Sequence, residues 1–396
     1  MFEKLKDYPV DPIMIGTELF AADSREHKLD LTVGIYQDEN GEAPILSSVK
    51  KAEQLLNQLQ KTKAYTALTG DAEYRRAVGD AVFGTNLWSP QDFVAAQTAG
   101  GAVALRVISD VLAQMPTSPT VWLQTPSYGN YIPILTASGA TFRSVPYYDA
   151  MERTVVIDQM LDGLREARSG DVFLMQGVCH NPTGADMTLE QFEEVLQVLE
   201  DRGIVPWIDL AYLGFDRGFV EDCEMARRII ARFPECIVCI TLSKTFGIYR
   251  DRAGALFVKT KPADRERMHR AVSAIIRSGP SHAPDHGPSV VKLILQDDTL
   301  RNLWLDELTQ MRNRVSWLRR KIVEMERDDF CKNSLAFLTD QNGMFSLLPL
   351  TPSQEEALTR EHGIHVVRGG RVNVARLADG SDISYLISTF HAVTEN

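Results

Sequence analysis

The 396-residue chain has no run of lysine and arginine residues, and its formal net charge at pH 7 is −11. Binding to nucleic acid or to an anionic membrane depends on clustered positive charge, so both functions are disfavoured. The chain also lacks an apolar run long enough to span a bilayer. Its first ten residues include Glu3, Lys4, Lys6 and Asp7 and contain no apolar core, so we expect no signal peptide.

Cysteine is also scarce. The five cysteines are scattered, which favours reduced thiols and a cytoplasmic location over a disulfide framework. Cys236 and Cys239 have the C-x-x-C spacing, but on a strand their side chains would point to opposite faces. We therefore interpret this pair as structural.

The histidines offer no convincing metal site. The pairs His362/His365 and His282/His286 lack the cysteine or carboxylate neighbours of a good zinc site. We therefore expect surface histidines and no bound metal.

No internal repeat or low-complexity linker divides the chain, although 396 residues exceed what one hydrophobic core usually serves. From residue 95, strand-like runs alternate with helical patterns, which indicates an α/β fold with a mostly parallel sheet flanked by helices. Apolar steps of three and four predict a long helix over 299–327 that links a large domain to a smaller α+β domain. We place an N-terminal arm and part of the small domain at 1–43, the large domain at 44–310 and the small C-terminal domain at 311–396.

One polar segment follows an apolar, β-branched run at 237–240 that predicts a buried strand. Thr241, Ser243 and Lys244 come directly after this run, with Arg252 close behind. A lysine can form a Schiff base with an aldehyde, and two hydroxyls with an arginine can hold a phosphate. Pyridoxal phosphate (PLP) carries both groups, and enzymes bind it through a lysine. Taken alone, the segment would more simply be a strand end with a solvated lysine and arginine.

Two more polar residues follow neighbouring strand-like runs. Asn181 lies beyond the run at 171–175, and Asp209 ends the run that begins at residue 204. A buried aspartate without a cationic partner is costly, so Asp209 is either hydrogen-bonded structurally or faces a cation such as a protonated pyridine nitrogen. Ligands of open parallel sheets bind beyond the carboxyl ends of the strands. Asn181, Asp209 and Lys244 are therefore expected to converge on one site.

Glycines mark two places where the backbone could approach a ligand. Gly100 and Gly101 precede a helix predicted from about residue 102 to 114, where backbone N–H groups and the helix dipole favour a phosphate. A flexible helix start explains this pair equally well. Gly34 interrupts a strand-like stretch at 29–36, and it marks either a close approach or a plain bulge.

The assembled chain resembles the aspartate/aromatic aminotransferases of the fold-type I PLP enzymes over essentially its whole length. Five motifs in matching order and spacing carry the resemblance. They are Ser-Lys-Thr-Phe-Gly-Ile-Tyr-Arg-Asp-Arg at 243–252, His-Asn-Pro-Thr-Gly at 180–184, Asp-Leu-Ala-Tyr-Leu-Gly-Phe at 209–215, Gln-Asn-Gly-Met-Phe at 341–345 and Arg-Val-Asn-Val-Ala at 371–375. The resemblance implies the fold-type I PLP-transferase fold and a homodimer with active sites shared between subunits.

The resemblance also implies roles for the residues that meet the cofactor. Lys244 would carry PLP and shuttle the proton at the reacting carbon, and Asp209 would pair with the ring nitrogen. Tyr212 and Asn181 would hydrogen-bond the ring oxygen. The phosphate would be held by Thr241, Ser243, Arg252, the backbone of Gly100, Gly101 and Ala102, and Tyr65 of the partner subunit.

Substrate contacts are implied in the same way. Arg371, aided by Asn181 and the backbone of Gly34, would bind the α-carboxylate in bidentate fashion. Arg277 of the partner subunit would receive a side-chain carboxylate. Tyr128, stacked on the cofactor ring, and Phe345 would complete the substrate pocket.

Several positions depart from the family pattern. Ala102 and Val103 stand where a serine or threonine and a glycine are usual, and losing one hydroxyl-to-phosphate bond costs about 1.5–3 kcal/mol. The other departures are Tyr128 for a tryptophan, Tyr131 and Gln176 for histidines behind Asp209, His282 for an asparagine of the side-chain pocket, and Arg376 for a glycine.

We therefore predict a transaminase that exchanges amino groups between glutamate/2-oxoglutarate and either aspartate/oxaloacetate or an aromatic amino acid and its 2-oxo acid. Arg277 favours dicarboxylates, whereas the altered pocket positions leave room for aromatic side chains. Two alternatives stay open: a PLP-dependent lyase or β-decarboxylase of an acidic amino acid, and a catalytically idle PLP-binding regulatory domain. Retention of Lys244, Arg277 and Arg371 argues against the idle domain.

Overall fold

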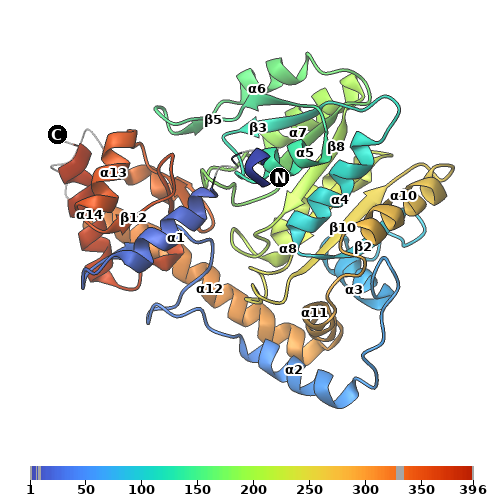
Figure 1. Ribbon diagram of the computed structural model, residues 1–396, viewed down its shortest axis with the longest axis horizontal. Coiled ribbons are helices and arrows are strands. Elements are labelled where there is room, and N and C mark those ends of the chain that lie inside the picture. The colour runs from blue at the N-terminus through green and yellow to red at the C-terminus, as the bar shows by residue number, and fades with distance from the viewer. Residues whose placement is uncertain (1, 6, 8–9, 327–333, 395–396) are drawn as a thin grey trace.

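A seven-stranded sheet, in the order β2-β10-β9-β8-β7-β3-β4, lies at the centre of the larger part of the molecule (Figure 1). The computed structural model describes residues 2–5, 7, 10–326 and 334–394 of the 396-residue chain. Strand β10 is antiparallel to both neighbours, whereas β9, β8, β7, β3 and β4 pair in parallel. The strands are β2 (Phe93–Ala99), β3 (Val121–Thr125), β4 (Phe142–Pro146), β7 (Val172–Gln176), β8 (Val205–Leu210), β9 (Cys236–Thr241) and β10 (Ala253–Lys259). The predicted α/β fold is confirmed.

Helices cover both faces of this sheet, which explains why its strands are apolar throughout (Figure 1). One face carries α4 (Gly101–Ala113), α5 (Tyr131–Ser138) and α10 (Arg265–Ser278). The other carries α3 (Ala72–Phe83), α6 (Ile157–Leu164), α7 (Leu189–Arg202) and α9 (Glu224–Arg232). Cys236 and Cys239 belong to the cores on opposite faces, as the two-residue period of a strand predicts.

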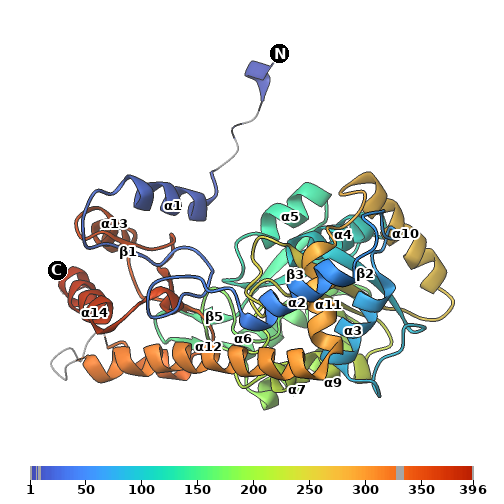
Figure 2. The ribbon, with the colours of Figure 1, turned by 90° about the horizontal axis from the view of Figure 1, so that it is seen from below.

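The longest described helix, α12 (Asp298–Met325), runs along both parts of the molecule (Figure 2). Asp297 caps its start by accepting a hydrogen bond from the backbone of Leu300 at 2.9 Å. Its early turns pack against α2 (Ser47–Leu59) and α11 (His286–Gln296), and its later turns pack against the C-terminal elements. The helix predicted over 299–327 is thus present, and its last predicted residue, Arg327, lies outside the described residues.

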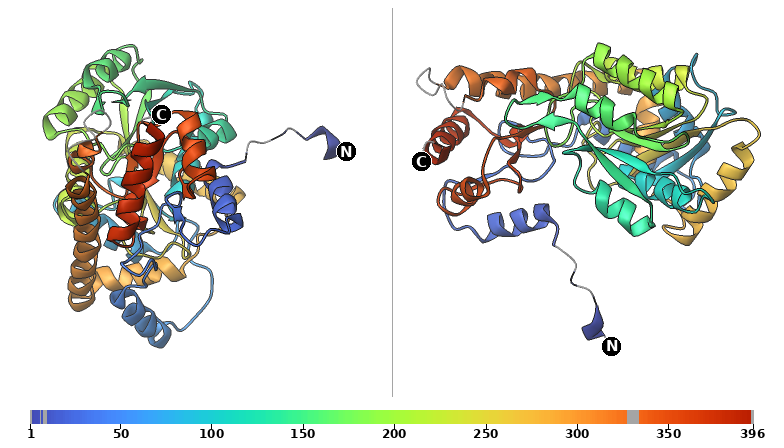
Figure 3. Two further views of the ribbon diagram at one scale, coloured as in Figure 1. Left: turned by 90° about the vertical axis from the view of Figure 1, so that its left-hand side faces the viewer. Right: turned by 90° about the horizontal axis from the view of Figure 1, so that it is seen from above.

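The C-terminal part is built on two small sheets. β11 (Phe345–Leu347) is antiparallel to β13 (Arg371–Asn373), and β1 (Leu29–Asp30) is parallel to β12 (Ile364–His365). Figure 3 shows α1 (Pro12–Ala22), α13 (Pro352–Arg360) and α14 (Gly380–Thr394) gathered in this part. The remaining elements are β5 (Tyr148–Asp149), β6 (Thr154–Val155), α8 (Phe219–Asp222) and the 3-10 turns η1 (Phe2–Lys4), η2 (Ala336–Asp340) and η3 (Val374–Arg376).

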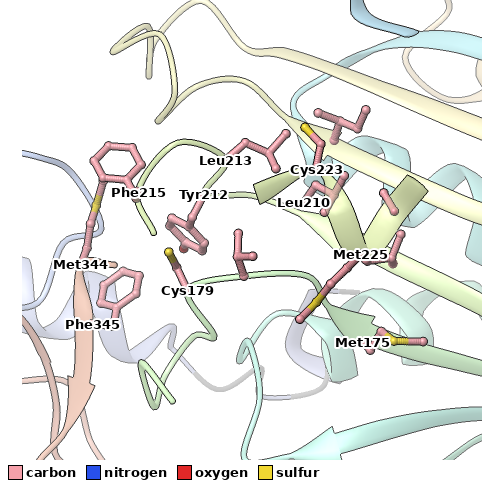
Figure 4. Packing of buried hydrophobic residues seen from close by; sticks show 14 of the residues in the cluster. Met175, Cys179, Leu210, Tyr212, Leu213, Phe215, Cys223, Met225, Met344 and Phe345 are labelled. Atoms are coloured by element: carbon pink, nitrogen blue, oxygen red, sulfur yellow. The ribbon is translucent and has the colours of Figure 1, made fainter. Parts of the chain in front are cut away.

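One apolar core joins the central sheet to the C-terminal part. Met344 and Phe345 lie against the residues that follow β7 and β8, among them Cys179 and Tyr212 (Figure 4). The rings of Phe345 and Tyr212 meet edge to face with centroids 5.7 Å apart. The loops that follow β7 and β8 therefore pack against the C-terminal part as well as against the central sheet.

Two expectations from the sequence are wrong. The strand-like stretch 29–36 forms a strand only at Leu29–Asp30, because the backbone groups beyond it bond to scattered partners, among them the side chain of Asn373, rather than to one neighbouring strand. His365 is buried rather than at the surface, because its Nε2 lies 3.0 Å from Oδ2 of Asp23. His286 is exposed, and His282 and His362 are half-buried.

The described cysteines form no disulfide. Cys179, Cys223, Cys236 and Cys239 are free and buried, and Cys331 lies outside the described residues. Within the described ranges, no helix is both long enough and apolar enough to cross a membrane.

Candidate active site

Ten of the residues singled out in the sequence line one pocket at the carboxyl ends of β7, β8 and β9. They come from strand ends, from the loops that follow and from the start of α4, which is why residues distant in sequence meet there. The ten are Gly101, Ala102, Tyr128, Gln176, Asn181, Asp209, Tyr212, Thr241, Lys244 and Arg252. Leu105 and Ala211 complete the lining, and sequence reasoning had not singled them out.

Asp209 presents one bonded and one unbonded oxygen. Oδ2 accepts a hydrogen bond of 2.8 Å from the hydroxyl of Tyr131, which is itself buried. Oδ1 is buried and has no hydrogen-bond partner in the described part of the chain. Burial raises the pKa of Asp209 to about 6, while the Tyr131 bond and the charge of Lys244 act to lower it. A buried acceptor without a partner points to a donor that a ligand would bring.

Lys244 lies in the loop that follows β9 and lines the pocket. Its Nζ lies 5.0 Å from the centre of the Tyr212 ring. Burial lowers the pKa of Lys244 to about 8, Asp209 acts to raise it, and Arg252 and Arg371 lower it further. An amine with such a pKa is partly neutral near pH 7, so it can act as a nucleophile or a base.

A cradle of backbone and hydroxyls surrounds the start of α4. Gly100 has φ +80°, and a Cβ on Gly101 would come within 2.0 Å of Oγ1 of Thr241. Only glycine allows this approach, which leaves the first N–H groups of α4 open toward the pocket. Arg252 donates from Nη1 to Oγ of Ser243 at 3.4 Å and from Nη2 to the carbonyl of Ala99 at 3.3 Å. The arrangement suits a phosphate.

Arg371 is buried on β13 beside the same pocket. It donates from Nη1 to Oδ1 of Asn181 at 3.3 Å and from Nη2 to the carbonyl of Thr32 at 2.6 Å. Its guanidinium lies 4.4 Å from the centre of the Phe345 ring, and its Nε has no partner among the described residues. Burial lowers the pKa of Arg371, yet an arginine stays charged at neutral pH. An uncompensated cation here suits a carboxylate ligand.

Gln176 and Gly34 support these groups from behind. Gln176 accepts from the backbone N–H of Asn181 at 2.9 Å and donates to its carbonyl at 2.8 Å. It therefore fixes Asn181, although it pairs with Asp209 in the sheet. A Cβ on Gly34 would lie 2.9 Å from Cζ of Phe345, so the chain at Gly34 passes directly over that ring. Close approach, rather than a bulge, explains Gly34.

Tyr65, Arg277 and His282 are not among the residues that line this pocket. Tyr65 is 87% exposed, and its ring stacks on that of His282 with centroids 4.7 Å apart. Arg277, at the end of α10, is exposed and donates to Oγ of Ser281 at 2.8 Å. These three side chains form a separate patch on the outside of the chain.

Residues 26–388 match the family model described as aminotransferase class I and II. The chain is 42% identical to the aspartate aminotransferase of Escherichia coli (strain K12), over 95% of this chain and 96% of that protein. It is 36% identical to the aromatic-amino-acid aminotransferase of Paracoccus denitrificans, over 96% and 97% of the two chains.

A solved structure is equally similar in fold. The aromatic-amino-acid aminotransferase from Burkholderia pseudomallei, covalently bound to pyridoxal phosphate, superposes with a TM-score of 0.94 at 32% identity and covers 99% of both chains. The predicted fold-type I architecture is thereby confirmed. With a family match over nearly its whole length and relatives above the level at which homology is secure, this chain belongs to the aminotransferase class I and II family.

Proposed function

We propose that this chain is a PLP-dependent transaminase that exchanges amino groups between glutamate/2-oxoglutarate and either aspartate/oxaloacetate or an aromatic amino acid and its 2-oxo acid. The observation that carries the proposal is the meeting of Lys244 and Asp209 in one pocket lined by Arg252, with Arg371 beside it. The relatives named above include both aspartate and aromatic-amino-acid aminotransferases, so both substrate classes are retained.

The residues present fit PLP on three counts. The unpartnered Oδ1 of Asp209 can accept from a protonated ring nitrogen, because its other oxygen is already held by Tyr131. The glycine start of α4, with Thr241 and Arg252, can hold the phosphate. Asn181 donates to the hydroxyl of Tyr212 at 3.3 Å and both line the pocket, which supports our proposal that the two groups would bond the ring oxygen. When bound, PLP supplies an electron-withdrawing ring that stabilises negative charge at the substrate α-carbon.

Lys244 would both hold the cofactor and move the proton. Its pKa of about 8 leaves a useful neutral fraction at pH 7, and Nζ can then take a proton from the substrate α-carbon and return it elsewhere. Asp209 stays anionic when a cation faces it, because an opposite charge offsets the effect of burial on its pKa. The chain's contribution is thus a mobile proton at Lys244 and a fixed negative charge at Asp209.

Arg371 would select the α-carboxylate that all candidate substrates share. Two of its nitrogens are already bonded to Asn181 and Thr32, so its orientation is fixed before a substrate arrives. Phe345 lies against the guanidinium and keeps water from that face. Discrimination between a second carboxylate and an aromatic ring then falls to residues farther out.

We further propose a homodimer in which the patch of Tyr65, Arg277 and His282 completes the pocket of the other subunit. These side chains are exposed or half-buried in one chain and lie outside its own pocket. The partner's Tyr65 would meet the phosphate, and the partner's Arg277 would meet the substrate side chain.

Residues 1–43, 44–310 and 311–396 remain our proposed arm, large domain and small domain. The reduced thiols support our proposal of a cytoplasmic enzyme.

The lyase and β-decarboxylase reading is not favoured, because the relatives at 36–42% identity are aminotransferases. The discriminating experiment is a half-reaction screen in which single amino acids are added to the PLP-loaded enzyme. Conversion of the PLP absorption band to that of the pyridoxamine form, with release of the 2-oxo acid, is the expected result. Release of CO₂ or ammonia without that conversion would overturn the proposal.

A further inference from the structure

The segment 30–38 lies against β13, where several of its backbone carbonyls accept hydrogen bonds from Asn373 and Arg371. The backbone N–H of Asn373 donates to the carbonyl of Leu31 at 2.9 Å. The side-chain amide of Asn373 donates to the carbonyls of Val33 at 2.7 Å and Ile35 at 2.8 Å. Beyond the β1–β12 pairing at Asp30, the segment is therefore held by single hydrogen bonds, several of them from β13, rather than by a regular ladder.

A buried ion pair fixes the start of this segment. Nη2 of Arg376 lies 2.9 Å from Oδ2 of Asp30, and the two side chains are only 11% and 7% exposed. Nε of Arg376 also donates to the carbonyl of Asp30. The family resemblance places a glycine where this chain has Arg376, so the cation is a feature of this chain and is so far without a role. A pair this well buried is costly to break, because the remaining partner would be an uncompensated charge.

Asp30 is linked to Arg371 through hydrogen bonds to one residue, Thr32. Its Oδ1 accepts from the backbone N–H of Thr32 at 3.0 Å and from the Thr32 hydroxyl at 2.6 Å. The carbonyl of Thr32 in turn accepts from Nη2 of Arg371 at 2.6 Å. Thr32 is fully buried, and its methyl group packs against Gly16 of α1. The route from Arg376 to Arg371 thus consists of direct contacts only.

We propose that Asp30 and Arg376 are positioning residues for the α-carboxylate site: together they hold Thr32 so that its carbonyl orients Arg371. The proposal rests on the proposed function, in which Arg371 binds the substrate carboxylate. Two carbonyl-type acceptors, Thr32 and Asn181, then fix the guanidinium plane, and bidentate carboxylate binding depends on that plane.

The effect expected is on substrate binding rather than on turnover. The α-carboxylate is bound equally in the ground state and during reaction, so loosening Arg371 removes uniform binding: KM rises while kcat is kept. Arg376→Gly and Asp30→Asn should each raise KM for amino acid and 2-oxo acid about tenfold and change kcat less than about threefold. Arg376→Lys, which keeps the charge but not the fork, should lose less.

The binding test uses the PLP-loaded enzyme and two probes that cannot react, succinate and 3-phenylpropionate, titrated by calorimetry. Arg376→Gly should weaken whichever of the two the wild type binds by about tenfold, because the carboxylate is their shared group. The double variant should lose less than the product of the two single losses, since both remove one interaction. Arg360→Ala, which removes an exposed ion pair of 3.0 Å with Glu356 in the same part of the chain, is the matched control and should change neither Kd nor KM.

Arg371→Ala separates this inference from the function on which it rests. If Arg371→Ala binds the probes as the wild type does, the carboxylate assignment of the proposed function fails. If Arg371→Ala loses binding while Arg376→Gly and Asp30→Asn stay within about twofold of wild type, Asp30 and Arg376 have only a structural role and the inference is overturned. Should Arg376→Gly not fold, Asp30→Asn and Arg376→Lys decide the question by the same measurements.

Discussion

Tyr131→Phe isolates the one hydrogen bond that the described residues give to the carboxylate of Asp209. The substitution keeps the ring and removes the donor 2.8 Å from Oδ2, which leaves both carboxylate oxygens without a partner among the described residues. A hydrogen bond to a charged group contributes about 1.5–3 kcal/mol. At about 1.4 kcal/mol for each pKa unit, the pKa of Asp209 in the PLP-free chain should rise from about 6 by roughly one to two units.

The raised pKa of Asp209 determines how the stability of the PLP-free chain depends on pH. In the PLP-free chain the folded pKa of Asp209 already lies above its ordinary value, so the folded state binds a proton more tightly than the unfolded state. Stability therefore falls as pH rises through about 6 in the wild type, and in Tyr131→Phe this loss should extend to about pH 7–8. PLP affinity at pH 7 should drop about two- to tenfold, because the anionic fraction of Asp209 that can pair with the ring nitrogen falls from about nine-tenths to between about a half and a tenth.

Two measurements check this reasoning. PLP dissociation followed by absorbance between pH 6 and 8 should show a steeper loss of affinity toward low pH in Tyr131→Phe than in the wild type. Thermal unfolding of the PLP-free protein over the same range should show the shifted stability window. Tyr147→Phe is a matched control, because that buried hydroxyl donates to the carbonyl of Ala185 at 2.7 Å and not to the site. An unchanged pH dependence of PLP affinity in Tyr131→Phe would refute the assignment.

Three further predictions follow from the site and its surroundings. Lys244→Ala should abolish the PLP absorption band of the lysine-bound cofactor and reduce kcat by about 10⁴-fold or more, because it removes both the attachment and the proton carrier; a variant with an intact band would contradict this. Mixing inactive Lys244→Ala subunits with Arg277→Ala subunits should restore up to about a quarter of wild-type dicarboxylate activity, since half of the dimers would be mixed and each would contain one intact site; no recovery would contradict shared sites. Asp23→Asn should lower the unfolding temperature at pH 7 and by progressively less as pH falls below about 4, because Arg25 and His365 hold the pKa of Asp23 well below its ordinary value and the stabilisation is lost only as pH falls toward that lowered pKa; a loss that is the same at pH 7 and at about pH 2 would count against this.

Much of the fold was predictable because short-range periodicity dictates it. The strand at 237–240 and the opposite faces of Cys236 and Cys239 follow from a period of two, and α12 follows from a period of 3.6. The convergence of Asn181, Asp209 and Lys244 followed from the rule that parallel strands end at one edge of a sheet.

What could not be predicted depends on contacts between distant segments. The residues from 31 to 36 have strand-like chemistry, yet the carbonyls of Val33 and Ile35 bond to the side chain of Asn373 more than 330 residues away. His365 has no carboxylate near it in sequence, and only the folded chain brings Asp23 to it. Gln176 turns to Asn181 rather than to Asp209, a choice of rotamer that no pattern in the sequence reveals.

Helix α12 contacts both the loop that carries Lys244 and the segment that carries Phe345. Near its start, Trp304 stacks on Phe246 with centroids 4.3 Å apart and donates to the carbonyl of Thr245, directly beside Lys244. Near its end, the buried Arg319 donates to the carbonyls of Gly343 and Phe345. The loop that carries Lys244 and the Phe345 ring beneath Arg371 are thus both held by α12.

The 28 residues of α12 contain neither glycine nor proline, so the helix has no built-in hinge. At about 1.5 Å per residue it is about 42 Å long, and a tilt of about 5° about its first turn would carry its far end about 4 Å. If the C-terminal part moved toward the central sheet, α12 would move as one rigid body. Its start, which contacts the residue beside Lys244, would then shift least and its far end most.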